Sequence, residues 1–163
     1  MLAEAPAFLI AIEQSAFAAA VRQSLWAYPA ANVGHILALF LFAGAVSIMD
    51  LTLLGALRGA KPATIVLQSR HAAIGGLLLM MVTGSVLFAA EASHVAMNPV
   101  FQIKAALIGI GILNALVTGP PLRRALAEMP AGAPFPLRLR AAAVVSLLTW
   151  LSVAACGRLI AYF

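Results

Sequence analysis

Residues 33–57 read VGHILALFLFAGAVSIMDLTLLGAL, a run of about 25 residues, long enough to cross a hydrocarbon core of about 30 Å as a tilted helix. Its side chains are apolar, small or hydroxylated, with two ionisable exceptions. His35 stands near the start and Asp50 near the end. Because an ionisable group inside a span is energetically costly, both residues are candidates for a functional site.

The composition indicates a membrane protein with one domain, residues 1–163. Of the 163 residues, 64% are hydrophobic and 9% are charged, whereas soluble domains average about 25% charged residues. The net charge of +5 does not indicate a nucleic-acid partner, because the basic residues lie between apolar runs and form no basic and aromatic patch. No Ser/His/Asp set, phosphate-binding loop, HExxH or CxxC motif occurs, so hydrolytic chemistry is not expected.

Three further apolar runs predict spans over residues 65–90, 100–118 and 139–162, the third span ending at Gly119-Pro120-Pro121. Residues 7–26 contain too many polar side chains to span, and their apolar residues recur at helical spacing, so we expect an amphipathic helix in the membrane interface. The links are short, which predicts antiparallel neighbours. The expected fold is therefore all-α, an up-down-up-down bundle of four transmembrane helices with an N-terminal interfacial helix.

The basic residues predict the orientation. Seven belong to the two links on one side: Arg58, Lys61, Arg70, Arg123, Arg124, Arg138 and Arg140. The other side has Arg22, Lys104 and Arg158. By the positive-inside rule, the seven face the cytoplasm of a bacterial inner membrane and both termini are periplasmic.

Two of the three histidines are expected to meet. His71 and His94 are about 34 Å apart along a continuous helix, so they cannot share a metal. His35 begins the first span and His94 follows the second, and antiparallel neighbours bring these ends together. This pair predicts a cofactor site near the periplasmic face.

The neighbours of this pair suggest two cofactors. In the first, His35 and His94 are axial ligands of a b-type haem, and Lys104 and Arg158 face its propionates. In the second, His35, His94, Glu91 and Met97 bind copper, because Glu91, His94 and Met97 recur at i, i+3 and i+6 and the thioether favours copper(I). The structural alternative involves no cofactor: Glu91 and His94 belong to a solvated loop, and Lys104 and Arg158 extend their charged groups to the membrane interface.

Asp50, Arg70 and His71 form a separate polar site at the cytoplasmic end. An Asp50–Arg70 or Asp50–His71 pair would neutralise a buried carboxylate. The functional alternative is a proton step or contact with a quinone headgroup.

Several stretches carry a resemblance to a known family: SAFAAAVRQSLWAYP, GHILAL, MDLTLLGALRG, TGSVLF, NPVFQIKAALIGIGILN and CGRLIAY. On these, the chain resembles a family of small bacterial inner-membrane proteins with four spans. The resemblance implies the architecture and no activity. A looser likeness links the HILAL-type span and the TG-containing second span to copper-resistance membrane proteins and to b561-type cytochrome subunits.

Three functions follow as hypotheses. The first is a membrane electron-transfer subunit that binds haem b and works with a redox partner or a larger membrane complex. The second is a copper-handling membrane protein. The third is a non-catalytic structural or assembly subunit, and a homo-oligomer is compatible with each.

Overall fold

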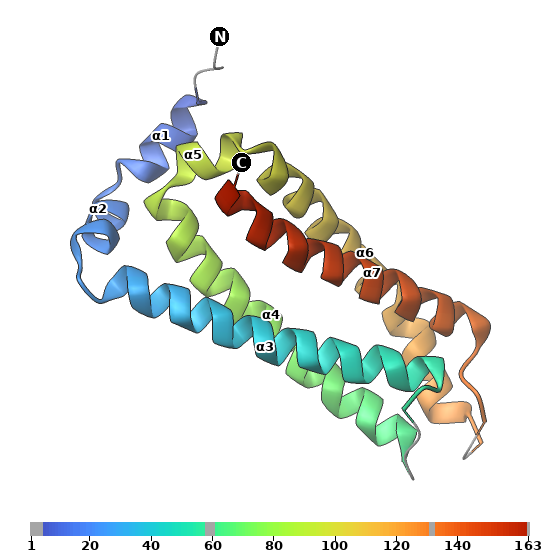
Figure 1. The fold of residues 1–163 in the computed structure, drawn as a ribbon. Helices are drawn as coiled ribbons and strands as arrows, with labels where there is room; N and C mark the ends of the chain where they lie inside the picture. The colour runs from blue at the N-terminus through green and yellow to red at the C-terminus, as the bar shows by residue number, and fades with distance from the viewer. Residues whose placement is uncertain (1–4, 58–60, 131–132, 163) are drawn as a thin grey trace.

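The computed structural model describes residues 5–57, 61–130 and 133–162. Within these residues, four helices are long and apolar enough to cross a membrane (Figure 1): α3 (Ala27–Leu54), α4 (Pro62–Ala90), α6 (Pro99–Glu128) and α7 (Leu137–Leu159), which a short turn, η1 (Ile160–Tyr162), extends. The prediction of an all-α, four-span membrane protein is confirmed, and a lipid bilayer is its expected surroundings. Arg58 lies outside the described residues, and the orientation in the membrane stays a prediction.

Two helix ends differ from the expected ones. α3 begins at Ala27 and ends at Leu54, where Gly55 adopts a left-handed conformation (φ 81°) and its N–H bonds back to the carbonyl of Thr52. α6 does not end at residue 118, because it continues through Pro120 and Pro121 to Glu128. Each proline removes only one donor to the preceding turn, a loss that membrane helices tolerate.

Each long helix runs antiparallel to the one before it (Figure 1). α3 packs on α4 and on α7, and α7 packs on α6, which gives the neighbour order α4–α3–α7–α6. In the described part of the chain, α4 and α6 do not pack on each other along their length. The bundle is therefore most open between these two outer helices.

A close approach of backbones joins α4 to α3. A Cβ added at Gly76 would lie 2.9 Å from the backbone nitrogen of Phe42. The Phe42 ring meets Trp150 of α7 edge to face, with ring centroids 4.6 Å apart and planes at 81°. Around this contact lies a middle cluster of buried side chains, which comprises Phe42, Ala45, Val46 and Ala73.

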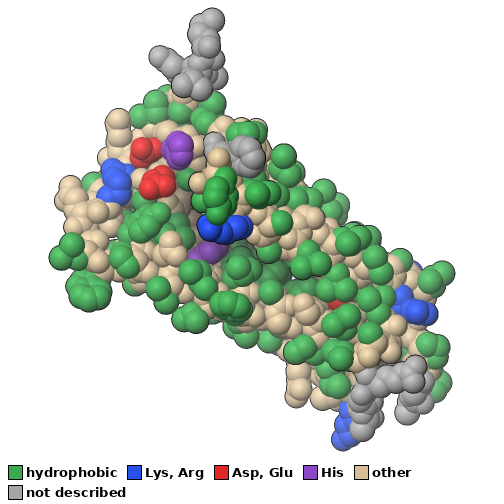
Figure 2. Space-filling view, in the orientation of Figure 1, with side chains coloured by type: hydrophobic (Ala, Val, Ile, Leu, Met, Phe, Trp, Pro, Cys, Tyr) green, Lys and Arg blue, Asp and Glu red, His purple; other side chains and the backbone are tan. Residues whose placement is uncertain are grey.

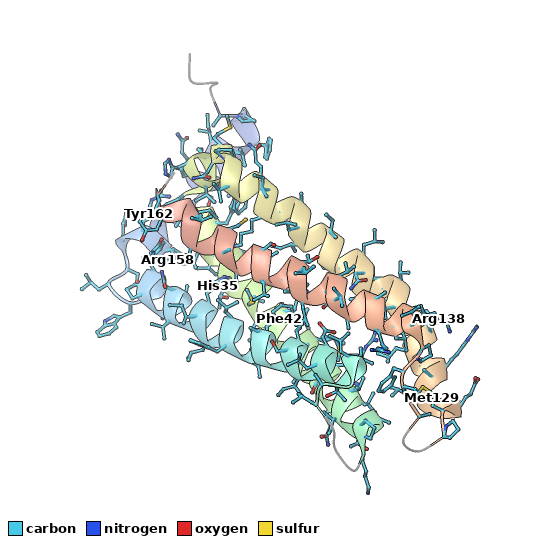
Figure 3. The ribbon with its side chains drawn as sticks, turned by 45° about the vertical axis from the view of Figure 1, so that its right-hand side comes forward. His35, Phe42, Met129, Arg138, Arg158 and Tyr162 are labelled. Carbon is cyan, nitrogen blue, oxygen red and sulfur yellow. The ribbon has the colours of Figure 1, made fainter. Side chains whose placement is uncertain are left out.

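A second apolar group, the end cluster, lies at the end of the bundle where α3 ends and α4 begins. Its buried members are Leu53, Val66, Leu122, Ala125, Phe135, Leu139 and Ala143. Figure 3 shows this end by the labels Met129 and Arg138, and the opposite end by Arg158 and Tyr162.

At the opposite end, the predicted single helix over residues 7–26 is two helices, α1 (Ala7–Glu13) and α2 (Ala16–Gln23). The chain breaks there because the Ser15 hydroxyl caps α2 by accepting from the backbone N–H of Ala18. Arg22 then donates to the carbonyls of Glu13 and Ala90, at 2.8 and 2.9 Å, and so ties α2 to α1 and to the end of α4. Their position in the membrane interface stays a prediction.

The close approach at Gly76 can be tested with its neighbour as the control. We expect Gly76→Ala to destabilise the protein in detergent by about 1–3 kcal/mol, because the added methyl group must push α3 and α4 apart. Gly75→Ala adds the same methyl group where nothing lies within 4 Å. The measurement is the midpoint of thermal unfolding, and equal midpoints for the two variants would contradict the close approach.

Candidate functional site

A cavity of about 240 Å³ lies among all four long helices, between the middle cluster and the end cluster. Its polar lining residues are Asp50 of α3, Arg70 of α4, Asn114 and Thr118 of α6, and Ser146 of α7. Phe42 and Trp150 line it on the side of the middle cluster. Because apolar clusters close the cavity at both ends, its polar groups are separated from the aqueous phases on either side.

Asp50 is the chemically unusual member of this lining. Its side chain is 1% exposed, because Asp50 follows Val46 by one turn and precedes Leu53 by one, and both of these face the interior. The carboxyl oxygen Oδ2 is buried and has no hydrogen-bond partner among the described residues, although Ser146 lies beside the carboxyl group. An unsatisfied buried acceptor costs about 1–3 kcal/mol. The position therefore suggests a role other than stability.

The predicted ion pair of Asp50 with Arg70 or His71 is wrong. In the described part of the chain, Asp50 forms no ion pair. The Arg70 side chain reaches across to α6, where its Nη2 would lie 3.0 Å from a Cβ at Gly119. His71 is exposed and does not line the cavity. Arg70 and Asp50 thus share one cavity, and the guanidinium lies against Gly119 of α6.

The cavity opens toward the sides of the bundle. Leu116 of α6 and Ile74 of α4 both line the cavity and are exposed, Leu116 to 68%. They belong to the two helices that do not pack on each other along their length. Figure 2, which views the bundle from the side of α3 and α7, shows hydrophobic side chains over most of its length and most of the charged ones toward the two ends. A molecule dissolved in the bilayer can therefore reach the cavity laterally.

His35, from the same helix as Asp50, lies toward the other end of the bundle (Figure 3). Its Nδ1 lies 2.9 Å from the hydroxyl oxygen of Thr83, and that hydroxyl donates to the carbonyl of Leu79 at 2.7 Å. Because the Thr83 hydroxyl donates its proton to Leu79, Nδ1 of His35 donates to the Thr83 oxygen. In a neutral ring the lone pair is then on Nε2. Gly84 leaves space beside the ring, since a Cβ there would lie 3.2 Å from Cε1.

The expected meeting of His35 with His94 is not found. α4 ends at Ala90, and the chain turns at Glu91 (φ −140°, ψ 37°) into a separate helix, α5 (Ala92–Met97). Among the described helices, α5 packs mainly on α1, α6 and α4, and His94 is exposed near Glu13. The turn at Glu91 and the packing of α5 therefore keep His94 with α1, away from its expected place beside His35.

The residues proposed as metal ligands are likewise not gathered. Within residues 5–57, 61–130 and 133–162, no group of three or more His, Cys, Asp or Glu side chains could hold a metal ion. Glu91, His94 and Met97 are exposed around α5. The copper site of His35, Glu91, His94 and Met97 is therefore not assembled.

Of the two cations assigned to haem propionates, one lies near His35. The Nζ of Lys104 reaches toward α7, where it would lie 3.3 Å from a Cβ at Gly157, and its charge acts on His35. Arg158 instead donates to the Tyr162 hydroxyl at 2.8 Å and lies over that ring, 5.0 Å from its centroid (Figure 3).

The carboxylate of Glu13, at the same end of the bundle as His35, has a structural partner. Glu13 Oε2 accepts a hydrogen bond from the backbone N–H of Ser93 at 2.7 Å, which joins α1 to α5. This bond lowers the pKa of Glu13 below its usual value, and the nearby Arg22 and His94 act in the same direction. Glu13 is therefore part of the contact between helices.

Sequence reasoning placed Asp50 and Arg70 at one polar site but missed the walls of the cavity. The side-chain amide of Asn114 on α6 donates to the carbonyl of Ala142 on α7 at 3.0 Å. Ser146 and Trp150 line the cavity from α7, one helical turn apart. The sequence did contain a signal for Ser146: it lies at a depth comparable to that of Asp50 on an antiparallel span, which places the two residues near each other.

The fold and the cavity together define a four-span membrane protein with a buried acidic site that opens toward lipid. Residues 14–163 match the model of DUF6644, a family of unknown function, and the chain belongs to that family. Neither the curated proteins nor the solved structures gave a match to this chain.

The isolated carboxyl of Asp50 leads to a stability prediction. We expect Asp50→Leu to raise the midpoint of unfolding in detergent, because it removes a buried acceptor that has no partner, worth about 1–3 kcal/mol. Asn114→Leu, in the same cavity, should lower the midpoint because it removes the bond to Ala142. A loss of stability in both variants would show that Asp50 has a structural partner.

Proposed function

We propose that the protein is a membrane subunit that binds the polar headgroup of a lipid-soluble small molecule in the cavity around Asp50. The observation that carries the proposal is the carboxyl group of Asp50: the residue lines a cavity open toward the sides of the bundle, and its buried Oδ2 has no partner among the described residues. A ligand that supplies this partner would offset the cost of burying the carboxyl group.

The lining suits a ligand with one polar end. Asp50, Arg70 and Thr118 provide hydrogen-bonding groups inside the cavity, and Ile74 and Leu116 provide apolar surface at its opening. Binding sites for small molecules commonly combine an apolar lining with a few placed polar groups. The headgroup would lie near Asp50 while the apolar tail passes between α4 and α6 into lipid.

The native tryptophans offer a direct test. The chain has two, Trp26, which is 81% exposed, and Trp150, which lines the cavity. In a Trp26→Phe background, Trp150 alone reports on the cavity. A brominated long-chain alcohol, added to the protein in detergent, should quench this fluorescence in a saturable manner, because bromine quenches only at close contact.

A pair of variants provides the control. Ala115→Phe places a ring in the cavity from an exposed position on α6 and should abolish the saturable quenching. Ala106→Phe makes the same change at an exposed position of α6 that does not line the cavity, and quenching should persist. Quenching that does not saturate, or that is equal in both variants, would overturn the proposal.

A second candidate function, electron transfer through a b-type haem, is supported by the geometry of His35. Its ring is held through Nδ1, so Nε2 is the nitrogen that would bind iron, and Lys104, whose charge acts on His35, would pair with a propionate. With His94 on α5, His35 would be the one histidine ligand at this end of the described chain.

A spectrum tests this second candidate. Purified protein with haem should show a Soret band that shifts on reduction with dithionite and is lost in His35→Ala. His94→Ala is the control and should leave the band unchanged, because His94 is on α5 and exposed. A colourless preparation with stoichiometric copper would favour the copper-handling function, and one with neither that purifies with other subunits would favour a structural role.

A further inference from the structure

We infer that the ligand of the cavity around Asp50 is a neutral, hydroxylated or carbonyl-bearing ring of the quinol and quinone class, with a ligand hydroxyl donating to the carboxyl group of Asp50. The inference rests on the proposed function and names the class of ligand that the same site would take. Three features of the lining support it: charge, size and the arrangement of donors and acceptors.

The charge of the lining favours a neutral headgroup. Asp50 and Arg70 are the two ionisable residues among those that line the cavity, and they have opposite signs. An anionic headgroup such as a phosphate would meet the carboxyl of Asp50, and a cationic one would meet the guanidinium of Arg70. Since like charges repel strongly where water is scarce, a neutral group that forms hydrogen bonds is preferred.

The size of the cavity favours a single ring. Its volume is about 240 Å³, whereas an apolar cavity of about 150 Å³ already holds benzene and pockets for drug-sized molecules begin at about 300 Å³. Phe42 and Trp150 pack edge to face at one side of this space, and rings of a ligand pack on such a wall in the same way. One substituted six-membered ring fits.

The hydrogen-bonding groups lie on two different walls. Asp50 of α3, with Ser146 of α7 beside it, provides an acceptor for a ligand hydroxyl. Arg70 reaches α6 beside Gly119, next to Thr118, and its guanidinium can only donate. A ring with oxygens on opposite sides therefore finds an acceptor on one wall and a donor on the other. A quinol satisfies both, and a quinone accepts from Arg70 and from Asp50 when its carboxyl is protonated.

The experiment compares ligands that share a ring and a tail. Binding of tritiated decylhydroquinone to the full chain in detergent, under anaerobic conditions, is measured with unlabelled decylhydroquinone, decylbenzoquinone or decylbenzene as the competitor. We expect both oxygenated rings to compete at least about tenfold better than decylbenzene, because one hydrogen bond to a charged group is worth about that factor.

Variants then locate the contact. Asp50→Leu should weaken decylhydroquinone binding about tenfold or more, and Ser146→Ala should weaken it to a smaller extent. Ser152→Ala, an exposed hydroxyl of α7 outside the cavity, is the matched control and should bind as the native protein does. Circular dichroism confirms that each variant is folded, and Ser146→Ala keeps the test valid should Asp50→Leu not fold.

The outcomes separate the two proposals. Saturable quenching of Trp150 by the brominated alcohol, together with equal competition by decylhydroquinone and decylbenzene, would overturn the quinol class and leave the lipid-soluble ligand in place. Native affinity in Asp50→Leu would also overturn the inference. Absence of both quenching and decylhydroquinone binding would overturn the site itself.

Discussion

The close approach of α4 to α3 at Gly76 is the constraint on which the rest of the structure depends. Because Gly76 has no side chain, the backbone of Phe42 lies against α4, and the Phe42 ring is free to meet Trp150 of α7. Packing between membrane helices relies on such close contacts, since lipid provides no hydrophobic force that drives them together. With α3 in contact with both α4 and α7, α4 is held apart from α6, and the cavity forms between them.

The same packing explains why a carboxyl group can remain unpaired inside the bundle. The middle cluster and the end cluster separate Asp50 from water on both sides, and Arg70 extends toward Gly119 of α6. A sequence selected for stability alone would have an apolar residue at position 50. Retaining Asp50 there lowers stability and leaves a carboxyl group with an unpaired oxygen in the lining of a cavity that opens toward the sides of the bundle.

The sequence predicted the spans well because their signal, a long run of apolar residues, is local. Ends that depend on neighbours were predicted less well: Pro120 and Pro121 do not stop α6, and Glu91 turns the chain before His94. The turn at Glu91 separates His94 from His35, and neither the length of the apolar run nor its periodicity predicts this turn. Asp50 and Arg70, predicted at one polar site, both line the cavity, whereas His71 does not; the direction of the Arg70 side chain depends on the absent Cβ of Gly119, on another helix.

α3 carries His35 and Asp50, the two ionisable residues of its span, at positions too far apart to belong to one small site. His35 and Asp50 are about 22 Å apart along the helix, so one small ligand cannot touch both. The middle cluster lies between them, at Phe42, Ala45 and Val46 of α3. Thr83 of α4 bonds to His35, and Arg70 and Ile74 of the same helix line the cavity around Asp50, so α3 and α4 both connect the two positions. The Phe42–Trp150 contact, which joins α3 to α7 and also lines the cavity, lies on α3 between the two positions.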